Sequence, residues 1–370
     1  MKIDTFLLER SQTLYENEVE INLTESGVHH ATMADLVPPD EMDAIRDLPL
    51  GYGYTDGTPA LRQAVADWYP ASSAENVLIA NGTSEANMLA LMSLADPGDH
   101  MVMLTPNFMQ LDGLARALGV EVTRVPLRPE NGWQPDMDDV RAAIGPATRL
   151  VTLCDPNNPT GVLMRGETRR ALAALTEEAG VWLLVDEIYR GSEIDGRPPA
   201  TAWGLGRKVI ATGGLAKSFG LPGLRMGWCI APPDLVTRMH ERQDYTTIGT
   251  GPLAQELSRR ALTNPVRDRL LARGRQILSA GRGRVEDWLR GRNGWSLVQP
   301  EASGMAFVAY DLDMDSERFV HELRDRTGVF VCAGDWFGIP RHIRIGFGVD
   351  RSDLDMGLER IDAFAKSHAG

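Results

Sequence analysis

The chain has 370 residues, 43% of them hydrophobic and 24% charged, and its formal net charge at pH 7 is -13. A chain of this length is expected to form two domains, or one large domain with a smaller partner. The acidic balance argues against nucleic acid or an anionic membrane as the main partner.

The N-terminal run 1–20 carries charge throughout, and it predicts a short amphipathic helix rather than a signal peptide. No stretch approaches the roughly 18 apolar residues that a membrane span requires. Cys154, Cys229 and Cys332 lie far apart in apolar surroundings, which is typical of buried free thiols. These features favour a cytoplasmic protein.

From residue 76 onward, short apolar runs alternate with helical patterns. The predicted strands are 76–80, 100–105, 149–155, 181–187, 208–213 and 227–232, and the predicted helices between them include 84–95 and 166–180. Unbroken apolar strands separated by helices indicate a largely parallel sheet that is buried on both faces. The sequence therefore predicts an α/β domain of three layers.

Beyond residue 253 the pattern changes to a long Arg-rich helical region, followed by short strands and two helices. We therefore predict a large domain at 46–252 and a smaller α+β domain at 253–370. The segment 1–45 lacks the character of a sheet core. It is expected to pack on the small domain or across a subunit interface.

Two polar groups follow or end predicted strands. The run DPNNPTG at 155–161 lies where open α/β sheets bind ligands, although Asn and Pro also suit an ordinary turn. Asp186 ends an apolar strand, where a buried carboxylate requires a partner. A protonated pyridine nitrogen or an Arg would serve, and a structural ion pair or a helix cap is the alternative.

Lys217 lies among glycines and a proline just after a predicted strand, so a ligand could approach it closely. A lysine in a partly buried pocket has a lowered pKa and acts as a nucleophile and base. Taken alone, the pattern favours an exposed loop lysine. Arg225, eight residues later, could bind a phosphate through two N–H groups.

Two further positions are candidates for anion binding. The run NGTSEAN at 81–87 begins a predicted helix, whose N-terminus attracts anions, although a plain helix cap gives the same pattern. Arg344 lies in a strand with apolar neighbours. An inward Arg there requires an anion such as a substrate carboxylate, and an Arg on an exposed edge strand is the alternative.

The order of these runs resembles that of the class I and II aminotransferases, which are pyridoxal-phosphate (PLP) enzymes of fold type I. The likeness covers nearly the whole chain and rests on Asn158, Asp186, Tyr189, Lys217 and Arg225. It implies an aspartate aminotransferase-like large domain, with a mostly parallel sheet of seven strands, and a smaller C-terminal domain.

The resemblance also implies roles for these residues. Lys217 would form the Schiff base with PLP and move a proton at the substrate's Cα. Asp186 would hold the pyridine nitrogen protonated, and Asn158 and Tyr189 would bind the ring 3′-oxygen.

The phosphate and the ring face have candidates of their own. The resemblance implies that Gly82, Thr83, Ser84 and Arg225 bind the phosphate. Phe108 matches the aromatic residue that stacks on the ring, although Tyr is more common there. Gly214 stands where the family usually has Ser or Thr, so one hydrogen bond worth roughly 1.5–3 kcal/mol is missing.

For the substrate, the resemblance implies that Arg344 binds the α-carboxylate, with Gly27, His29 and Asn158 nearby. Tyr52 matches the tyrosine that reaches the phosphate of a neighbouring subunit, and Tyr54 is the competing choice. The resemblance thus implies a homodimer with shared active sites and a free amino acid as substrate, and no metal ion is expected.

Two reactions remain open. Transamination is the commonest activity of the family. The runs at 25–36, 125–143, 216–228 and 243–247 also resemble the capreomycidine synthases, which eliminate water from a hydroxylated arginine and cyclise its guanidine.

In that second reading His29 or His30 is a candidate acid or base, and two exposed loop histidines are the simpler alternative. Glu9, Glu25 or Asp244 is a candidate receiver for a guanidinium. A ligand sensor without turnover is a third alternative. Such sensors carry a separate DNA-binding domain, for which this acidic chain has no room.

Overall fold

The computed structural model describes residues 3–368. A seven-stranded sheet forms its centre, in the order β2-β8-β7-β6-β5-β3-β4. Its strands are β2 Val77–Asn81, β3 His100–Thr105, β4 Glu121–Pro126, β5 Thr148–Cys154, β6 Trp182–Asp186, β7 Val209–Gly214 and β8 Met226–Ile230. The pairings from β7 through β6, β5 and β3 to β4 are parallel, whereas β8 pairs antiparallel with both β7 and β2. The predicted mostly parallel sheet is confirmed.

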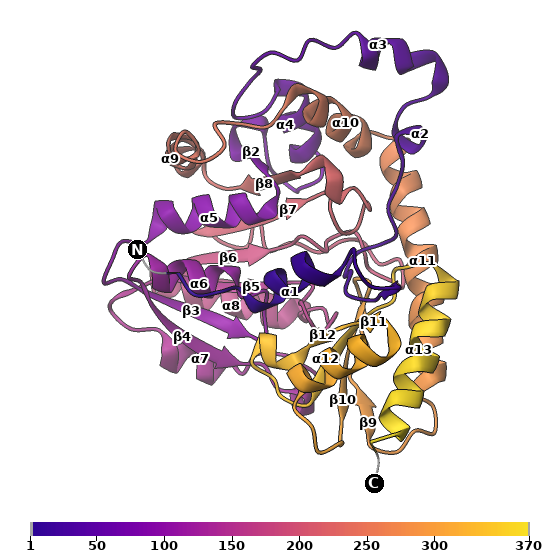
Figure 1. Ribbon diagram of the computed structural model, residues 1–370. Helices are drawn as coiled ribbons and strands as arrows, with labels where there is room; N and C mark the ends of the chain where they lie inside the picture. Colours follow the sequence, from indigo (N-terminus) through magenta and orange to yellow (C-terminus); the bar gives the residue numbers. More distant parts are fainter. Residues whose placement is uncertain (1–2, 369–370) are drawn as a thin grey trace.

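Most strands of this sheet are buried on both faces. In β2, Leu78 and Ala80 pack with α5 Thr83–Leu94 and α9 Pro233–Gln243, while Val77 and Ile79 pack with other helices. Successive side chains of a strand point to opposite faces, so a run that is apolar throughout serves two helical layers. The three-layer prediction is confirmed by this arrangement (Figure 1).

The remaining helices are arranged around and beyond this sheet. They are α1 Leu7–Tyr15, α2 Met33–Leu36, α3 Met42–Arg46, α4 Pro59–Ala66, α6 Gln110–Ala117, α7 Met137–Ala143, α8 Gly166–Glu178, α10 Pro252–Leu262, α11 Val266–Leu289, α12 Ser316–Thr327 and α13 Arg351–Lys366. Within residues 3–368, no helix is long and apolar enough to cross a membrane.

Two smaller sheets lie in the C-terminal part. Their strands are β1 Ile21–Asn22 and β11 Val329–Phe330 in one, and β9 Trp295–Leu297, β10 Met305–Tyr310, β12 Cys332–Ala333 and β13 His342–Gly346 in the other. Every strand of the large sheet precedes residue 253, and every strand of the small sheets except β1 follows it. This agrees with our proposed domains, 46–252 and 253–370, whose limits stay a prediction.

The N-terminal segment joins the C-terminal part through β1, which pairs in parallel with β11. In Figure 1 the indigo segment carries α1 across the region between the large sheet and the small domain. The edge strand β4 was not predicted. Only one of its side chains, Val125, is buried, so it lacks the apolar run that marks the other strands.

Close contact between β8 and the start of α5 depends on Gly227. A Cβ atom at this position would lie 2.3 Å from both the Gly82 carbonyl carbon and the Thr83 nitrogen, which are backbone atoms. We expect Gly227→Ala to lower the free energy of unfolding by about 1–3 kcal/mol, because the backbone must shift. Urea unfolding measures the change. Gly223→Ala is the matched control, since nothing lies within 4 Å of its added carbon, and equal stability of the two variants would contradict the prediction.

Candidate active site

A cavity opens at the carboxyl edge of the large sheet. The strands β3, β5, β6 and β7 end there because they are parallel, and two successive antiparallel pairings through β8 bring the end of β2 to the same edge. Its lining residues are Leu8, Glu9, Gln12, Ser26, Gly82, Thr83, Ser84, Phe108, Cys154, Asn158, Asp186, Ile188, Tyr189, Ala216, Lys217, Pro222, Arg225 and Arg344. The structure therefore brings together most of the residues that the sequence singled out.

Asp186 is the last residue of β6, and its side chain is buried. Asn87 Nδ2 donates to Oδ2 over 2.8 Å, and the Ile188 N–H donates to Oδ1 over 3.0 Å. Burial raises the pKa of Asp186 to about 6, and these two neutral donors offset the rise only in part. A buried carboxylate held by neutral donors fits a protonated pyridine nitrogen, as the resemblance implies.

A second part of the cavity suits a phosphate. The helix α5 begins at Thr83, and the N–H groups of a first helical turn lack partners within the helix. The Arg225 guanidinium lies beside this turn. Its Nη2 is so close that a Cβ atom built on Gly82 would be only 2.5 Å away. A cation beside a helix N-terminus fits a doubly charged anion.

Gly214 has a steric explanation here. A Cβ atom at this position would lie 2.6 Å from Thr83 Oγ1 and 2.8 Å from the Met226 carbonyl oxygen. Thr83 Oγ1 in turn donates to the Gly213 carbonyl over 2.9 Å. The Thr83 hydroxyl thus fills the space that a Ser or Thr side chain at position 214 would need.

Three consecutive residues of the N-terminal segment contact the remaining polar residues of the cavity. Arg344 Nη2 donates to the Thr24 carbonyl over 2.6 Å. Lys217 Nζ donates to Glu25 Oε1 over 2.9 Å, and Ser26 Oγ lies 2.8 Å from the Tyr189 hydroxyl. Motif spacing singled out Lys217, Tyr189 and Arg344, whereas the contacts with Thr24 and Ser26 appear only in the fold.

Glu25 is held firmly beside Lys217. Its Oε1 also accepts the N–H groups of Ser26 and Gly27, each over 2.8 Å. Burial alone would raise the pKa of Glu25, but the Lys217 ammonium and these hydrogen bonds outweigh it and lower that pKa to about 2. Glu25 is therefore held as a carboxylate beside the Lys217 ammonium.

Arg344 is almost completely buried. Nη1 donates to Asn158 Oδ1 over 2.8 Å, and Nη2 lies 3.1 Å from Cys332 Sγ. Among the described residues, its buried Nε has no hydrogen-bond partner. Arg344 lines the cavity, and a buried guanidinium there fits the α-carboxylate of an amino acid, as the resemblance implies.

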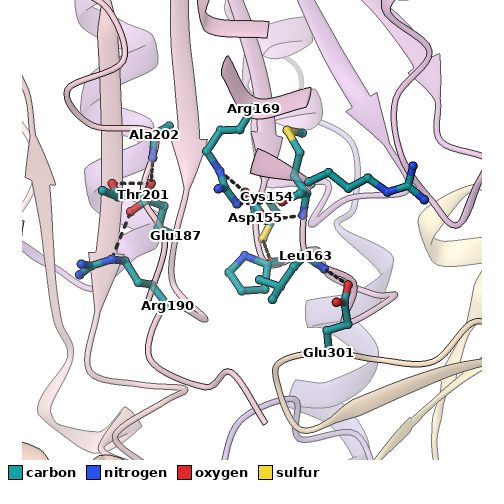
Figure 2. A network of polar contacts seen from close by, with 12 residues as sticks. Cys154, Asp155, Leu163, Arg169, Glu187, Arg190, Thr201, Ala202 and Glu301 are labelled. Carbon is teal, nitrogen blue, oxygen red and sulfur yellow. Dashed lines mark hydrogen bonds and ion pairs between the residues drawn. The ribbon is translucent and has the colours of Figure 1, made fainter. Parts of the chain in front are cut away.

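The loop that carries Asn158 is fixed by a polar network (Figure 2). Arg169 Nε donates to Asp155 Oδ2 over 2.8 Å, and the Leu163 N–H donates to Glu301 Oε2 over 3.3 Å. Beside it, Glu187 accepts from Thr201 and Ala202. The Arg169 contact fixes the start of the 155–161 loop, and the N–H groups of Glu301 and Ala302, which donate to the Gly161 carbonyl, join its end to the small domain.

His29 is not brought to this cavity, which corrects its expected place near the substrate. Hydrogen bonds from the Val28 N–H to the Lys217 carbonyl and from the His29 N–H to the Gly348 carbonyl fix the local backbone. Val28 is buried and His29 turns outward, where its Nε2 lies 3.5 Å from Asp350 Oδ2. The outward direction of the next side chain, His30, supports the simpler reading of two exposed loop histidines.

Other expected residues divide between the cavity and the surface. Phe108 lines the cavity and packs edge-on against Phe6, with ring centroids 4.9 Å apart. Gly27 lies against the Lys217 backbone. Tyr52 and Tyr54 lie in a separate hollow and are 93% and 59% exposed, so a role for either at a phosphate stays a prediction that needs a second subunit.

Comparison with known proteins agrees with this geometry. The family described as aminotransferase class I and II matches residues 31–361. The chain is 33% identical to the capreomycidine synthase of Streptomyces vinaceus over 95% of this chain and 91% of the relative. It is 30% identical to the arginine–pyruvate transaminase of Pseudomonas aeruginosa over 84% of this chain and 81% of the relative.

A solved structure gives the same result for the fold. The PLP-dependent aminotransferase of Streptococcus suis superposes with a TM-score of 0.94 at 30% identity, and the match covers 100% of both chains. The predicted fold type and the predicted cofactor, pyridoxal 5′-phosphate, are both confirmed by these likenesses.

The raised pKa of Asp186 predicts a pH-dependent stability of the protein without cofactor. Because folding raises this pKa from 3.8 to about 6, the protonated group favours the folded state, and the advantage is lost as the pH rises through 6. Relative to the parent, Asp186→Asn should therefore gain about 2 kcal/mol of unfolding free energy between pH 4 and pH 7.

Urea unfolding of both apoproteins across this pH range measures the difference. Asp112→Asn is the control, since Arg124 and Arg116 lower the pKa of Asp112, and its difference from the parent should run in the opposite direction. A difference for Asp186→Asn that stays constant with pH would contradict the prediction.

Proposed function

The chain belongs to the class I and II aminotransferase family, and from this we propose that it converts an L-amino acid whose side chain ends in a guanidinium group. It is a PLP-dependent enzyme acting on the amino group of an amino acid. The substrate class is our proposal. It is carried by one observation, which is that the carboxylate of Glu9 lines the cavity that holds Lys217, with Glu16 and Glu25 nearby.

Glu9 and Gln12 of α1 line the cavity. Burial raises the pKa of the nearby Glu16, and so does repulsion from the carboxylates of Glu25 and Glu9. A cationic side chain would relieve this repulsion. With Arg344 as the receiver of the α-carboxylate, the cavity offers a positive and a negative group to the two ends of one molecule.

The residues of the chain can perform the common first step. When bound, pyridoxal phosphate supplies an electron sink for the negative charge that develops at the substrate's Cα. Arg344 would hold the α-carboxylate and Lys217 would take the Cα proton. Glu25 would stabilise the resulting ammonium group of Lys217, since it already pairs with Nζ.

Transamination is the reaction we propose first, because it is the activity of most of the family's named relatives. The second candidate is cyclodehydration of a hydroxylated arginine, which the 33% identity to a capreomycidine synthase favours. The two reactions share the removal of the Cα proton. They differ in whether the amino group is lost from the product.

The test is incubation of the holoenzyme with L-arginine or 3-hydroxy-L-arginine in the absence of any 2-oxo acid. Transamination releases a 2-oxo acid once per active site and changes the absorbance of the bound cofactor. A product lighter by one water, formed over many turnovers with the cofactor spectrum restored, would instead establish cyclodehydration. Lys217→Ala, the inactive control, should lose the absorbance of the lysine-bound cofactor.

The guanidinium proposal has its own test in Glu9→Gln. We expect kcat/KM for arginine to fall about fivefold, equivalent to roughly 1 kcal/mol for a partly exposed ion pair. The value for citrulline, a neutral analogue of the same shape, should hardly change. Glu18→Gln is the control, because Glu18 is exposed and does not line the cavity. An equal loss for both substrates would refute the assignment of Glu9.

We also propose a homodimer with shared active sites. Large exposed side chains gather at the hollow of residues 50–55 and 247–252, among them Leu50, Tyr52, Tyr54 and Ile248. Exposed apolar patches of this kind support association. We expect the protein to sediment as a dimer. Tyr52→Phe should weaken cofactor binding without dissociating the dimer, and Tyr54→Phe is the matched comparison. A monomer that binds cofactor at full strength would exclude this arrangement.

A cytoplasmic location is proposed from the thiol groups. Cys154, Cys229 and Cys332 are free and buried, and unpaired thiols are typical of proteins that stay in a reducing compartment. Cell fractionation tests this location. Recovery of the protein outside the cell would exclude it.

A further inference from the structure

A chain of hydrogen bonds reaches Asp186 from the side of the sheet that faces α5. Thr212 Oγ1 donates to Asn87 Oδ1 over 2.7 Å, and Asn87 Nδ2 donates to Asp186 Oδ2 over 2.8 Å. Thr212 lies on β7 and is paired in register with Asp186 on β6, and Asn87 lies on α5 above both. The hydrogen-bond chain thus joins three elements of the large domain, β7, α5 and β6, and ends at Oδ2 of Asp186.

These groups are shielded from water, so the direction of each hydrogen bond matters. Thr212 is 0% exposed, Asn87 is 2% exposed and Asp186 is 8% exposed. Because the Thr212 hydroxyl donates its hydrogen bond to the amide oxygen of Asn87, the amide N–H group of Asn87 faces Asp186. The reverse orientation would place the amide oxygen against the carboxylate, which is unfavourable unless Asp186 carries a proton.

We propose that Asn87, oriented by Thr212, is a positioning residue that keeps Asp186 ionised and turned toward the ring nitrogen of the cofactor. Burial raises the pKa of Asp186, and among the groups that lower it Asn87 has the largest effect. Without this donor, the carboxylate would hold its own proton more tightly. The proton between Asp186 and the ring nitrogen would then move toward the carboxyl group.

Other ionisable groups near Asp186 belong to different elements. They are Cys154 from β5, Glu187 and Tyr189 after β6, Lys217 and Arg225 after β7, and Arg344 from β13. A substitution at Asn87 or Thr212 leaves all of them in place. The difference between variant and parent therefore reports on Asp186 alone.

The experiment uses holoenzyme prepared with pyridoxal phosphate that carries nitrogen-15 in its ring. In the parent, the ring nitrogen should give the chemical shift of the protonated form. In Asn87→Leu, the shift should move toward the unprotonated form, the cofactor dissociation constant should rise about tenfold or more, and kcat should fall with little change in KM. Ser93→Ala is the matched control, because Ser93 is also buried on α5 but has no hydrogen bond to Asp186.

A second pair of variants decides the question if Asn87→Leu fails to fold. Thr212→Val keeps the shape but removes the hydroxyl, so it should shift the ring nitrogen in the same direction by a smaller amount. Thr212→Ser keeps the hydroxyl and should match the parent. Identical nitrogen shifts and cofactor affinities in the parent, Thr212→Val and Asn87→Leu would overturn the proposal.

The inference rests on the cofactor assignment of the proposed function, but not on its substrate class. Both readouts are made without substrate. A failure of the guanidinium proposal would leave the nitrogen shifts unchanged, and a failure of the Asn87 proposal would leave the substrate preference unchanged.

Discussion

The buried charge of Asp186 is the constraint on which the site depends. A carboxylate at the end of an apolar strand is costly, and the described residues offer it only neutral donors. The cost is offset when a cation binds opposite it. The fold supplies the place for that cation by ending β2, β3, β5, β6 and β7 at one edge, with the N-terminus of α5 beside them. The order of the strands in the sheet therefore determines where the cofactor site lies.

The N-terminal segment connects this edge to the small domain. Thr24, Glu25 and Ser26 contact one arginine from β13, one lysine after β7 and one tyrosine after β6. Just before them, β1 is paired with β11. This one segment contacts residues of both domains, so it links the positions of Arg344 and Lys217.

Sequence patterns predicted the parts of the site that lie at strand ends. Apolar runs mark buried strands. The polar residue that ends such a run, such as Asp186, lies at the carboxyl edge of the sheet, where ligands bind. Side chains that depend on the path of a loop were harder to predict, and His29 was misplaced because two backbone hydrogen bonds turn it outward. Asn87 gave no signal at all, since a helical asparagine acquires its partner only when β6 and β7 pack beneath it.

Continuity in the sequence has a consequence for how such enzymes diversify. The three contacts made by residues 24–26 reach groups that are scattered over more than 150 positions, yet they come from adjacent codons. A few neighbouring mutations can therefore alter the surroundings of Lys217 and of Arg344 together, while the central sheet stays intact. This short segment is a place where one scaffold could change its chemistry in small steps.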